Sequence, residues 1–136
     1  MTVFVDTSAL YALLDSNDPA HPDAAAFFAR DGRREKLQTT SYVVLESAAL
    51  VHRRLGSDSV RALLTDLIAP IEVVWVDEET HRAGVRSFLA ALSAHASLVD
   101  HVSFVVMRSN GIFRAFSYDD DFVRAGFELA QASRGA

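Results

Sequence analysis

Short β-rich runs alternate with helical patterns along the whole chain, and this alternation constrains the fold more than any other feature. The β-rich runs cover 2–5, 37–40, 71–76, 112–117 and, less strongly, 126–130. The helical patterns between them cover 9–15, 23–31, 41–56, 57–69, 78–96 and 98–111. This order favours an α/β fold with a parallel sheet covered on both faces.

The ends of these segments are marked by residues that start and stop helices. Asp6-Thr7-Ser8 supplies a helix start directly after the first run, Ser41 can cap the long third helix, and Gly56 can end it. The chain has 136 residues and neither an internal repeat nor a low-complexity linker, so we expect one domain over 1–136.

Composition excludes several classes of protein. Half of the residues are hydrophobic, which excludes disorder, and the absence of cysteine excludes disulfides and thiolate metal sites. No apolar run approaches the ~20 residues of a membrane span, and "MTVFVDTSAL" has no basic region typical of a signal peptide. We expect a cytoplasmic protein with no membrane contact, although sequence does not exclude secretion. The net charge of −5 argues against loose, charge-driven binding of nucleic acid.

Carboxylates recur where a parallel sheet would gather them. Asp6 follows the first β-rich run, and Asp119 follows the fourth within "SYDDDF". Asp100 opens the helix that precedes that fourth run. The carboxyl ends of parallel strands meet at one sheet edge, where sites form in open α/β folds. Singly, Asp6 and Asp100 could be helix caps and Asp119 part of a solvated turn.

Glu46 is a lone charge in "VVLESAALV", so we expect it to be buried. A buried carboxylate needs Arg53, a metal or water as its partner. If Glu46 joins Asp6, Asp100 and Asp119 at one edge, the like charges require a cation. An all-oxygen ligand set favours Mg²⁺ or Mn²⁺ over zinc or copper. His101, beside Asp100, is more typical of a helix surface than of a site.

Four segments together resemble the PIN-domain ribonucleases, and in particular the bacterial VapC-type toxins of toxin–antitoxin pairs. They are "VFVDTSAL" at 3–10, the segment around Glu46, "LVDHVSF" at 98–104 and "AFSYDDDF" at 115–122. The resemblance spans nearly the whole chain. It implies a three-layer α/β/α sandwich with a central, mainly parallel sheet of four to five strands.

The resemblance also implies an acidic quartet that holds Mg²⁺ or Mn²⁺ and the positions that form it. The matching catalytic and metal-binding positions are Asp6, Glu46, Asp100 and Asp119. Secondary candidates are Asp121, Ser117, Ser103, Thr7 and Ser8. Asp120 stands where many similar toxins carry a basic residue, so we expect it to face solvent, with local phosphate contact altered. We expect Asp121 to extend the site or cap a helix, and Phe122 to pack in the core.

The activity implied is metal-dependent endonucleolytic cleavage of RNA, often structured RNA such as tRNA or rRNA. Implied partners are a cognate VapB-type antitoxin and a second copy of the chain in a homodimer. We expect Asp6 and Asp100 to be direct ligands, Asp119 to bind a second ion or a ligand water, and Glu46 to orient water. The alternative is a catalytically silent PIN-like binding module that acts only through its protein partner.

Two other α/β families with an aspartate after the first strand do not fit. Haloacid-dehalogenase-like phosphatases need D-x-D there, whereas this chain has Asp6-Thr7-Ser8. Phospho-receiver domains need a lysine late in the chain, and the only lysine is Lys36.

Overall fold

The structure of the chain is a computed structural model that describes residues 1–132. The last four residues of the expected domain, 133–136, lie outside the described residues. The elements are β1 (Thr2–Val5), α1 (Thr7–Leu14), α2 (His21–Arg30), β2 (Lys36–Thr40), α3 (Ser41–Leu55), α4 (Ser57–Ala62), a π-helical segment (Leu63–Leu67), β3 (Glu72–Val74), α5 (Glu78–Leu89), α6 (Leu98–Ser109), β4 (Arg114–Phe116), α7 (Asp121–Arg124) and β5 (Glu128–Leu129).

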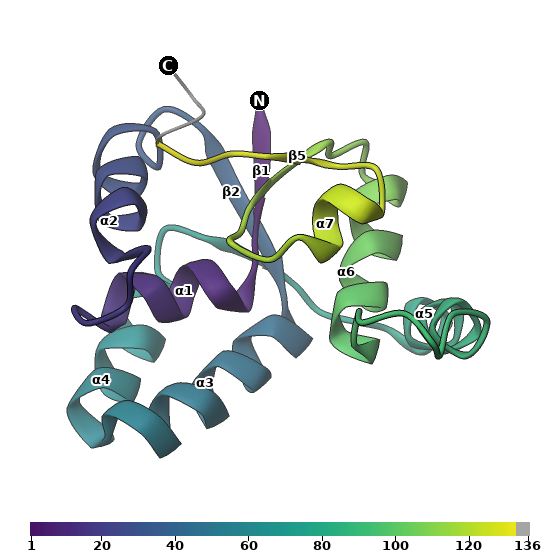
Figure 1. Cartoon of the computed structure of the whole chain (residues 1–136), viewed down its shortest axis with the longest axis horizontal. Coiled ribbons are helices and arrows are strands. Elements are labelled where there is room, and N and C mark those ends of the chain that lie inside the picture. The colour runs from purple at the N-terminus through teal and green to yellow at the C-terminus, as the bar shows by residue number, and fades with distance from the viewer. Residues whose placement is uncertain (133–136) are drawn as a thin grey trace.

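The five strands form one parallel sheet in the order β3-β2-β1-β4-β5, which confirms the predicted fold class. Figure 1 shows helices on both sides of the strands, with α1 and α2 on one side and α6 and α7 on the other. The central strand β1 is buried from Val3 to Val5, as its apolar sequence predicts. Every neighbouring pair is parallel, so all carboxyl ends of the strands lie at one edge of the sheet.

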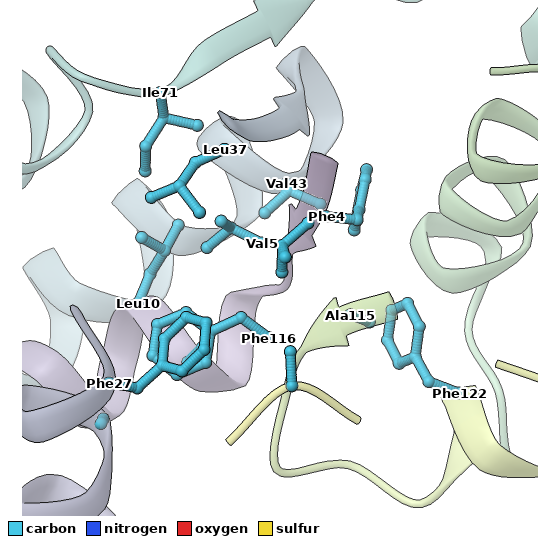
Figure 2. Packing of buried hydrophobic residues seen from close by; sticks show 14 of the residues in the cluster. Phe4, Val5, Leu10, Phe27, Leu37, Val43, Ile71, Ala115, Phe116 and Phe122 are labelled. Carbon is cyan, nitrogen blue, oxygen red and sulfur yellow. The ribbon is translucent and has the colours of Figure 1, made fainter. Parts of the chain in front are cut away.

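The core consists largely of aromatic and aliphatic side chains on the two faces of the sheet. The rings of Phe27 and Phe116 lie 4.3 Å apart between centroids, and Figure 2 shows them overlapping beside Leu10. On the other side, the Phe122 ring meets that of Phe104 at 5.1 Å and 87°. Phe122 is fully buried, which confirms its predicted place in the core and anchors the chain just after the three aspartates.

The contact between α5 and α6 sets the position of Asp100. Gly84 of α5 is buried, and a Cβ atom built there would overlap Cγ2 of Val102 and lie 3.2 Å from its Cα. Glycine therefore lets the two helices approach closely. Because Val102 follows Asp100 by two residues, this packing fixes the amino-terminal part of α6, which carries Asp100, against α5.

Several predicted boundaries were wrong, each for a local reason. The cap of α3 is Thr40, whose Oγ1 accepts from the Val43 N–H at 3.2 Å, whereas Ser41 Oγ accepts from the Val76 N–H. The predicted helix 78–96 ends at Leu89, because the alanine-rich stretch that follows is mostly exposed and lacks the packing that sustains a helix. Helix α7 forms where Asp121 was expected to extend the site or cap a helix, but Asp121 is the first residue of the helix and not its cap.

Candidate active site at the carboxyl edge of the sheet

Asp6 lies at the carboxyl end of β1, where it caps α1 and points into a small network of hydroxyl groups. Its Oδ2 accepts from Ser8 Oγ at 2.8 Å and from Ser117 Oγ at 2.9 Å. The strand register pairs Val5 with Phe116, and the Asp6 N–H donates to the Phe116 carbonyl at 3.1 Å. The sheet therefore brings together two predicted site residues, Asp6 and Ser117, that are 111 positions apart.

The environment of Asp6 disfavours its charged form. The side chain is 4% exposed, and burial followed by the charge of Asp100 raises its pKa from 3.8 to about 7. The hydrogen bonds from Ser8 and Ser117 act in the opposite direction and lower the pKa, but they do not offset the burial. A bound cation would favour the carboxylate form of Asp6.

Asp100 lies in the first turn of α6 and closes a capping box with Ser97. Its backbone N–H donates to Ser97 Oγ at 3.2 Å, and its own Oδ2 accepts from the Ser97 N–H at 3.0 Å. Burial raises the pKa of Asp100, and the nearby charges of Asp119 and Asp121 raise it further. The cap of α6 is therefore Ser97, whereas Asp100, which one interpretation of the sequence made the cap, closes the box from the first turn of the helix and belongs to the acidic cluster.

The three consecutive aspartates have three different environments. Asp119 is half-buried and its N–H donates to Ser117 Oγ at 3.0 Å, while its Oδ1 accepts from the Asp121 N–H at 3.0 Å. Asp121 is 3% exposed and begins α7. Asp120 is exposed, which confirms the prediction that it faces solvent.

Two basic side chains that the sequence did not single out hold Asp121. His95 Nδ1 lies 2.9 Å from Asp121 Oδ2, and Arg124 Nη1 donates to Oδ1 at 3.2 Å. Burial alone would raise the pKa of Asp121, but the hydrogen bonds from His95, Asp119 and Arg124 hold it below its ordinary value. The same contact with Asp121 raises the pKa of His95. Arg124 was detectable as the i+3 partner of Asp121 on a helix, whereas His95 lies in a loop with no local signal.

Glu46 is the clear departure from the expected site. The sequence predicted a buried carboxylate, but Glu46 is exposed and forms no hydrogen bond or ion pair within residues 1–132, with Arg53 or otherwise. The buried positions of α3 are Val43, Ser47 and Val51, which recur every fourth residue on one face. Glu46 precedes Ser47 and so turns away from that face. Its apolar neighbour Leu45 is itself 72% exposed, so an apolar neighbour did not indicate burial of Glu46.

The other candidate polar residues are buried, and the hydroxyl groups of Thr7 and Ser103 have hydrogen-bond partners within the fold. Thr7 accepts from Ser47 Oγ at 3.3 Å, which ties α1 to α3. Ser103 donates to the Val99 carbonyl of its own helix at 2.9 Å. His101 is buried at 7% exposure, contrary to the expected helix-surface position.

A cleft of about 750 Å³ opens beside the acidic cluster. Its lining includes Ser8, His95, Tyr118, Asp119, Asp120 and Arg124. Ser8 links the cleft wall to the deeper Asp6, and Tyr118 donates its N–H to Ser8 Oγ at 2.9 Å. The cleft therefore presents the carboxylates of Asp119 and Asp120 together with two basic side chains, His95 and Arg124, which form its basic wall.

The donor set fits a hard divalent ion. One ligand atom each from His95, Asp119 and Asp121 lie within 4.8 Å of one another. Asp6 and Asp100 add two buried carboxylates whose pKa values are raised by burial and by the charges of neighbouring carboxylates, a condition that a cation relieves. Carboxylate oxygens are the ligands that Mg²⁺ and Mn²⁺ prefer, whereas the imidazole of His95 departs from the all-oxygen set that the sequence predicted.

Comparison with known proteins finds similarity over nearly the whole chain. The family model described as "PIN domain" matches residues 3–128. The 23S rRNA-specific endonuclease VapC20 of Mycobacterium tuberculosis is 32% identical over 126 residues, covering 92% of this chain and 95% of its own.

Solved structures show the same fold. The crystal structure of Mycobacterium tuberculosis VapC20, described as a sarcin-ricin loop cleaving toxin, is 29% identical with a TM-score of 0.86 and covers 95% of this chain and 98% of its own. A VapBC2 structure from Rickettsia felis, bound to a promoter DNA fragment, is 10% identical with a TM-score of 0.72 and covers 96% and 98%. DNA-bound VapBC from Salmonella typhimurium is 15% identical with a TM-score of 0.67 and the same coverages. The last two share the fold alone.

Proposed function

The chain belongs to the PIN-domain family, and on that basis we propose that it is a metal-dependent endoribonuclease toxin of the VapC type. The observation that carries the proposal is the environment of Asp6. A carboxylate buried beside Asp100 and oriented by Ser117 and by Ser8, which itself lines the cleft, is suited to hold a cation against a phosphodiester. The relative that is 32% identical over 92% of this chain is a 23S rRNA-specific endonuclease, which supports the same reaction.

We propose that Asp6, Asp100 and Asp119 hold the ion, Mg²⁺ or Mn²⁺, as direct ligands or through a ligand water. When bound, such an ion lowers the pKa of a coordinated water and compensates the charge that develops on the phosphate. Ser8 and Ser117 keep Asp6 in one orientation by donating to its Oδ2. Glu46 remains a proposed member that orients water at the open side, since its exposure leaves it free of other partners within residues 1–132.

The aspartates after β4 have separate proposed roles. Asp119 faces the cleft, and its rotamer is fixed because its Oδ1 accepts from the Asp121 N–H. Asp121, anchored by His95 and Arg124, supports that turn and contributes negative charge. His95 and Arg124 line the cleft as well, so they provide the phosphate contact that Asp120 does not.

We propose structured RNA as the substrate, with ribosomal RNA as the first candidate. The VapC20 relative is described as cleaving the sarcin-ricin loop, and its structure covers 95% of this chain at a TM-score of 0.86. We further propose that a VapB-type antitoxin neutralises the protein, which the VapBC complexes of the same fold support, and that the toxin forms a homodimer. Within residues 1–132, no helix combines the length and apolar character needed to span a bilayer.

A cleavage assay with a matched pair of variants tests the activity. Purified protein is incubated with ribosomal RNA in Mn²⁺ or in EDTA, alongside Asp6→Asn and the control Asp120→Asn. We expect cutting in Mn²⁺ by the parent and by Asp120→Asn, whose exposed side chain lines the cleft but is not a proposed metal ligand, and none in EDTA or by Asp6→Asn. Cutting by Asp6→Asn at the parent rate would refute the assignment. Tight antitoxin binding by a parent that cuts neither ribosomal nor transfer RNA would indicate the silent binding module instead.

A further inference from the structure

A second cavity, of about 240 Å³, lies on the far side of the basic wall of the active-site cleft. Its lining residues come from α5, the loop before α6, α6 itself and α7: Ser87, Ala91, Ala94, His95, Ala96, His101, Phe104, Arg108, Asp121, Arg124 and Ala125. Three of these, Ala94, His95 and Arg124, also line the cleft. A strand of RNA in the cleft therefore has this cavity directly across the His95–Arg124 wall.

The walls of the cavity combine flat rings with small side chains. The rings of His101 and Phe104 lie 5.6 Å apart between centroids at 64°, and the Arg108 guanidinium lies 5.9 Å from the Phe104 centroid. Alanine side chains leave the remaining space open. The volume is below the ~300–1,000 Å³ of typical small-molecule sites, so it suits one ring system and not a whole nucleotide.

One wall carries a polar atom without a partner. His101 Nδ1 is 2.7 Å from Ser87 Oγ, while its Nε2 is buried and has no hydrogen-bond partner within residues 1–132. Buried polar atoms are nearly always paired in folded proteins. Among the described residues, Nε2 of His101 is therefore an unpaired polar group within the wall of the cavity.

The charges around the cavity match a nucleotide. Arg108, Arg124 and His95 are the basic groups of its lining, against the single carboxylate of Asp121, which His95 and Arg124 already contact. Base-specific recognition of RNA uses unstacked bases held against aromatic side chains and guanidinium planes. We propose that this cavity, defined by Ser87, Ala91, His101, Phe104 and Arg108, is a subsite that receives one unstacked nucleobase of the RNA strand in the cleft.

This subsite rests on the proposed function, because it assigns a base-binding role next to the same acidic cluster. In this arrangement the cavity selects the nucleotide that lies beside the cleaved bond. The residues that hold the ion are a separate group. Sequence preference is then set by α5 and α6, and not by the aspartates.

Nuclear magnetic resonance titration of the metal-free protein tests the subsite without requiring cleavage. Isotope-labelled protein is titrated with each of the four nucleoside 5′-monophosphates and with ribose 5-phosphate, which lacks the base. We expect at least one nucleotide to shift the amide signals of Ala91, Ala96 and Ala125, and ribose 5-phosphate to leave them unchanged. If no nucleotide shifts them, or if ribose 5-phosphate shifts them equally, the subsite is refuted even if the protein cuts RNA.

A matched pair of substitutions locates the binding. Ala91→Leu fills the cavity, whereas Ala90→Leu adds the same side chain at an exposed neighbouring position that does not line it. We expect Ala91→Leu to weaken nucleotide binding at least about 5-fold, the lower range for loss of one stacked base, and Ala90→Leu to leave it unchanged. Equal affinity of Ala91→Leu and the parent, with the remaining amide spectrum intact, refutes the location. If the parent protein does not cut RNA but nucleotides still shift its amide signals, the proposed function is refuted and the subsite is not.

Discussion

Replacing Asp6 by asparagine should stabilise the metal-free protein at alkaline pH while it removes metal-dependent activity. Asparagine keeps an oxygen that can accept from Ser8 and Ser117, and it is as good a helix cap as aspartate. It removes the charge that burial and Asp100 disfavour. The site is thus predicted to reduce the stability of the protein until a cation is bound.

The magnitude and its sign follow from the pKa of Asp6. Its folded-state value of about 7 lies above the ordinary 3.8, so the folded protein retains a proton that the unfolded chain has lost. The contribution of Asp6 to the stability of the folded protein is fully present below about pH 4 and is lost as pH rises through about 7. At ~1.36 kcal/mol per pKa unit, the loss amounts to at most about 4 kcal/mol.

Urea unfolding in EDTA at pH 4.5 and pH 8 measures this effect. At each pH we subtract the free energy of unfolding of the parent from that of Asp6→Asn. We expect this difference to be larger at pH 8 than at pH 4.5 by up to about 4 kcal/mol. At pH 8, Mn²⁺ at 100 times its dissociation constant should stabilise the parent by about 2.7 kcal/mol and Asp6→Asn by much less. If the difference in free energy of unfolding between Asp6→Asn and the parent is the same at both pH values, the reasoning is refuted.

Three further substitutions test other parts of the site. Ser117→Ala removes a buried donor to Asp6 and the acceptor for the Asp119 N–H. We expect the free energy of unfolding to fall by about 1–3 kcal/mol in thermal or urea unfolding, and the cleavage rate to fall as well. An unchanged cleavage rate would contradict the positioning role of Ser117. Glu46→Gln should change stability by no more than about 0.5 kcal/mol, since the residue is exposed, and should lower Mn²⁺ affinity less than Asp119→Asn does in calorimetric titration. Gly84→Ala should cost about 1–3 kcal/mol in urea unfolding, because its Cβ overlaps Val102; unaltered stability would show that α5 and α6 are not closely packed there.

Sequence alone predicted the parallel sheet and the edge where the site forms, because strand ends are encoded locally. The apolar run at β1 followed by Asp6-Thr7-Ser8 marks both a strand end and a helix cap. Parallel strands then place Asp6 and Ser117 at the same edge of the sheet, and the pairing of β1 with β4, which the sequence did not predict, makes them neighbours.

The features that sequence missed depend on distant packing. Whether Glu46 is buried depends on which face of α3 meets α1, and Ser47, one residue on, takes the inner position. His95 reaches Asp121 only because α5 ends at Leu89 and frees the loop before α6. Neither outcome is encoded in the neighbouring residues.

Direct Mn²⁺ binding to two adjacent variants tests the central claim that the carboxylates at this sheet edge form one metal site. Asp119→Asn and Asp120→Asn make the same chemical change at neighbouring positions, one beside the acidic cluster and one exposed to solvent. Titration of the parent and both variants, followed by the electron paramagnetic resonance of free Mn²⁺, should show a loss of affinity of at least about 10-fold for Asp119→Asn and none for Asp120→Asn. Equal Mn²⁺ affinity in the parent and in Asp119→Asn would contradict the account.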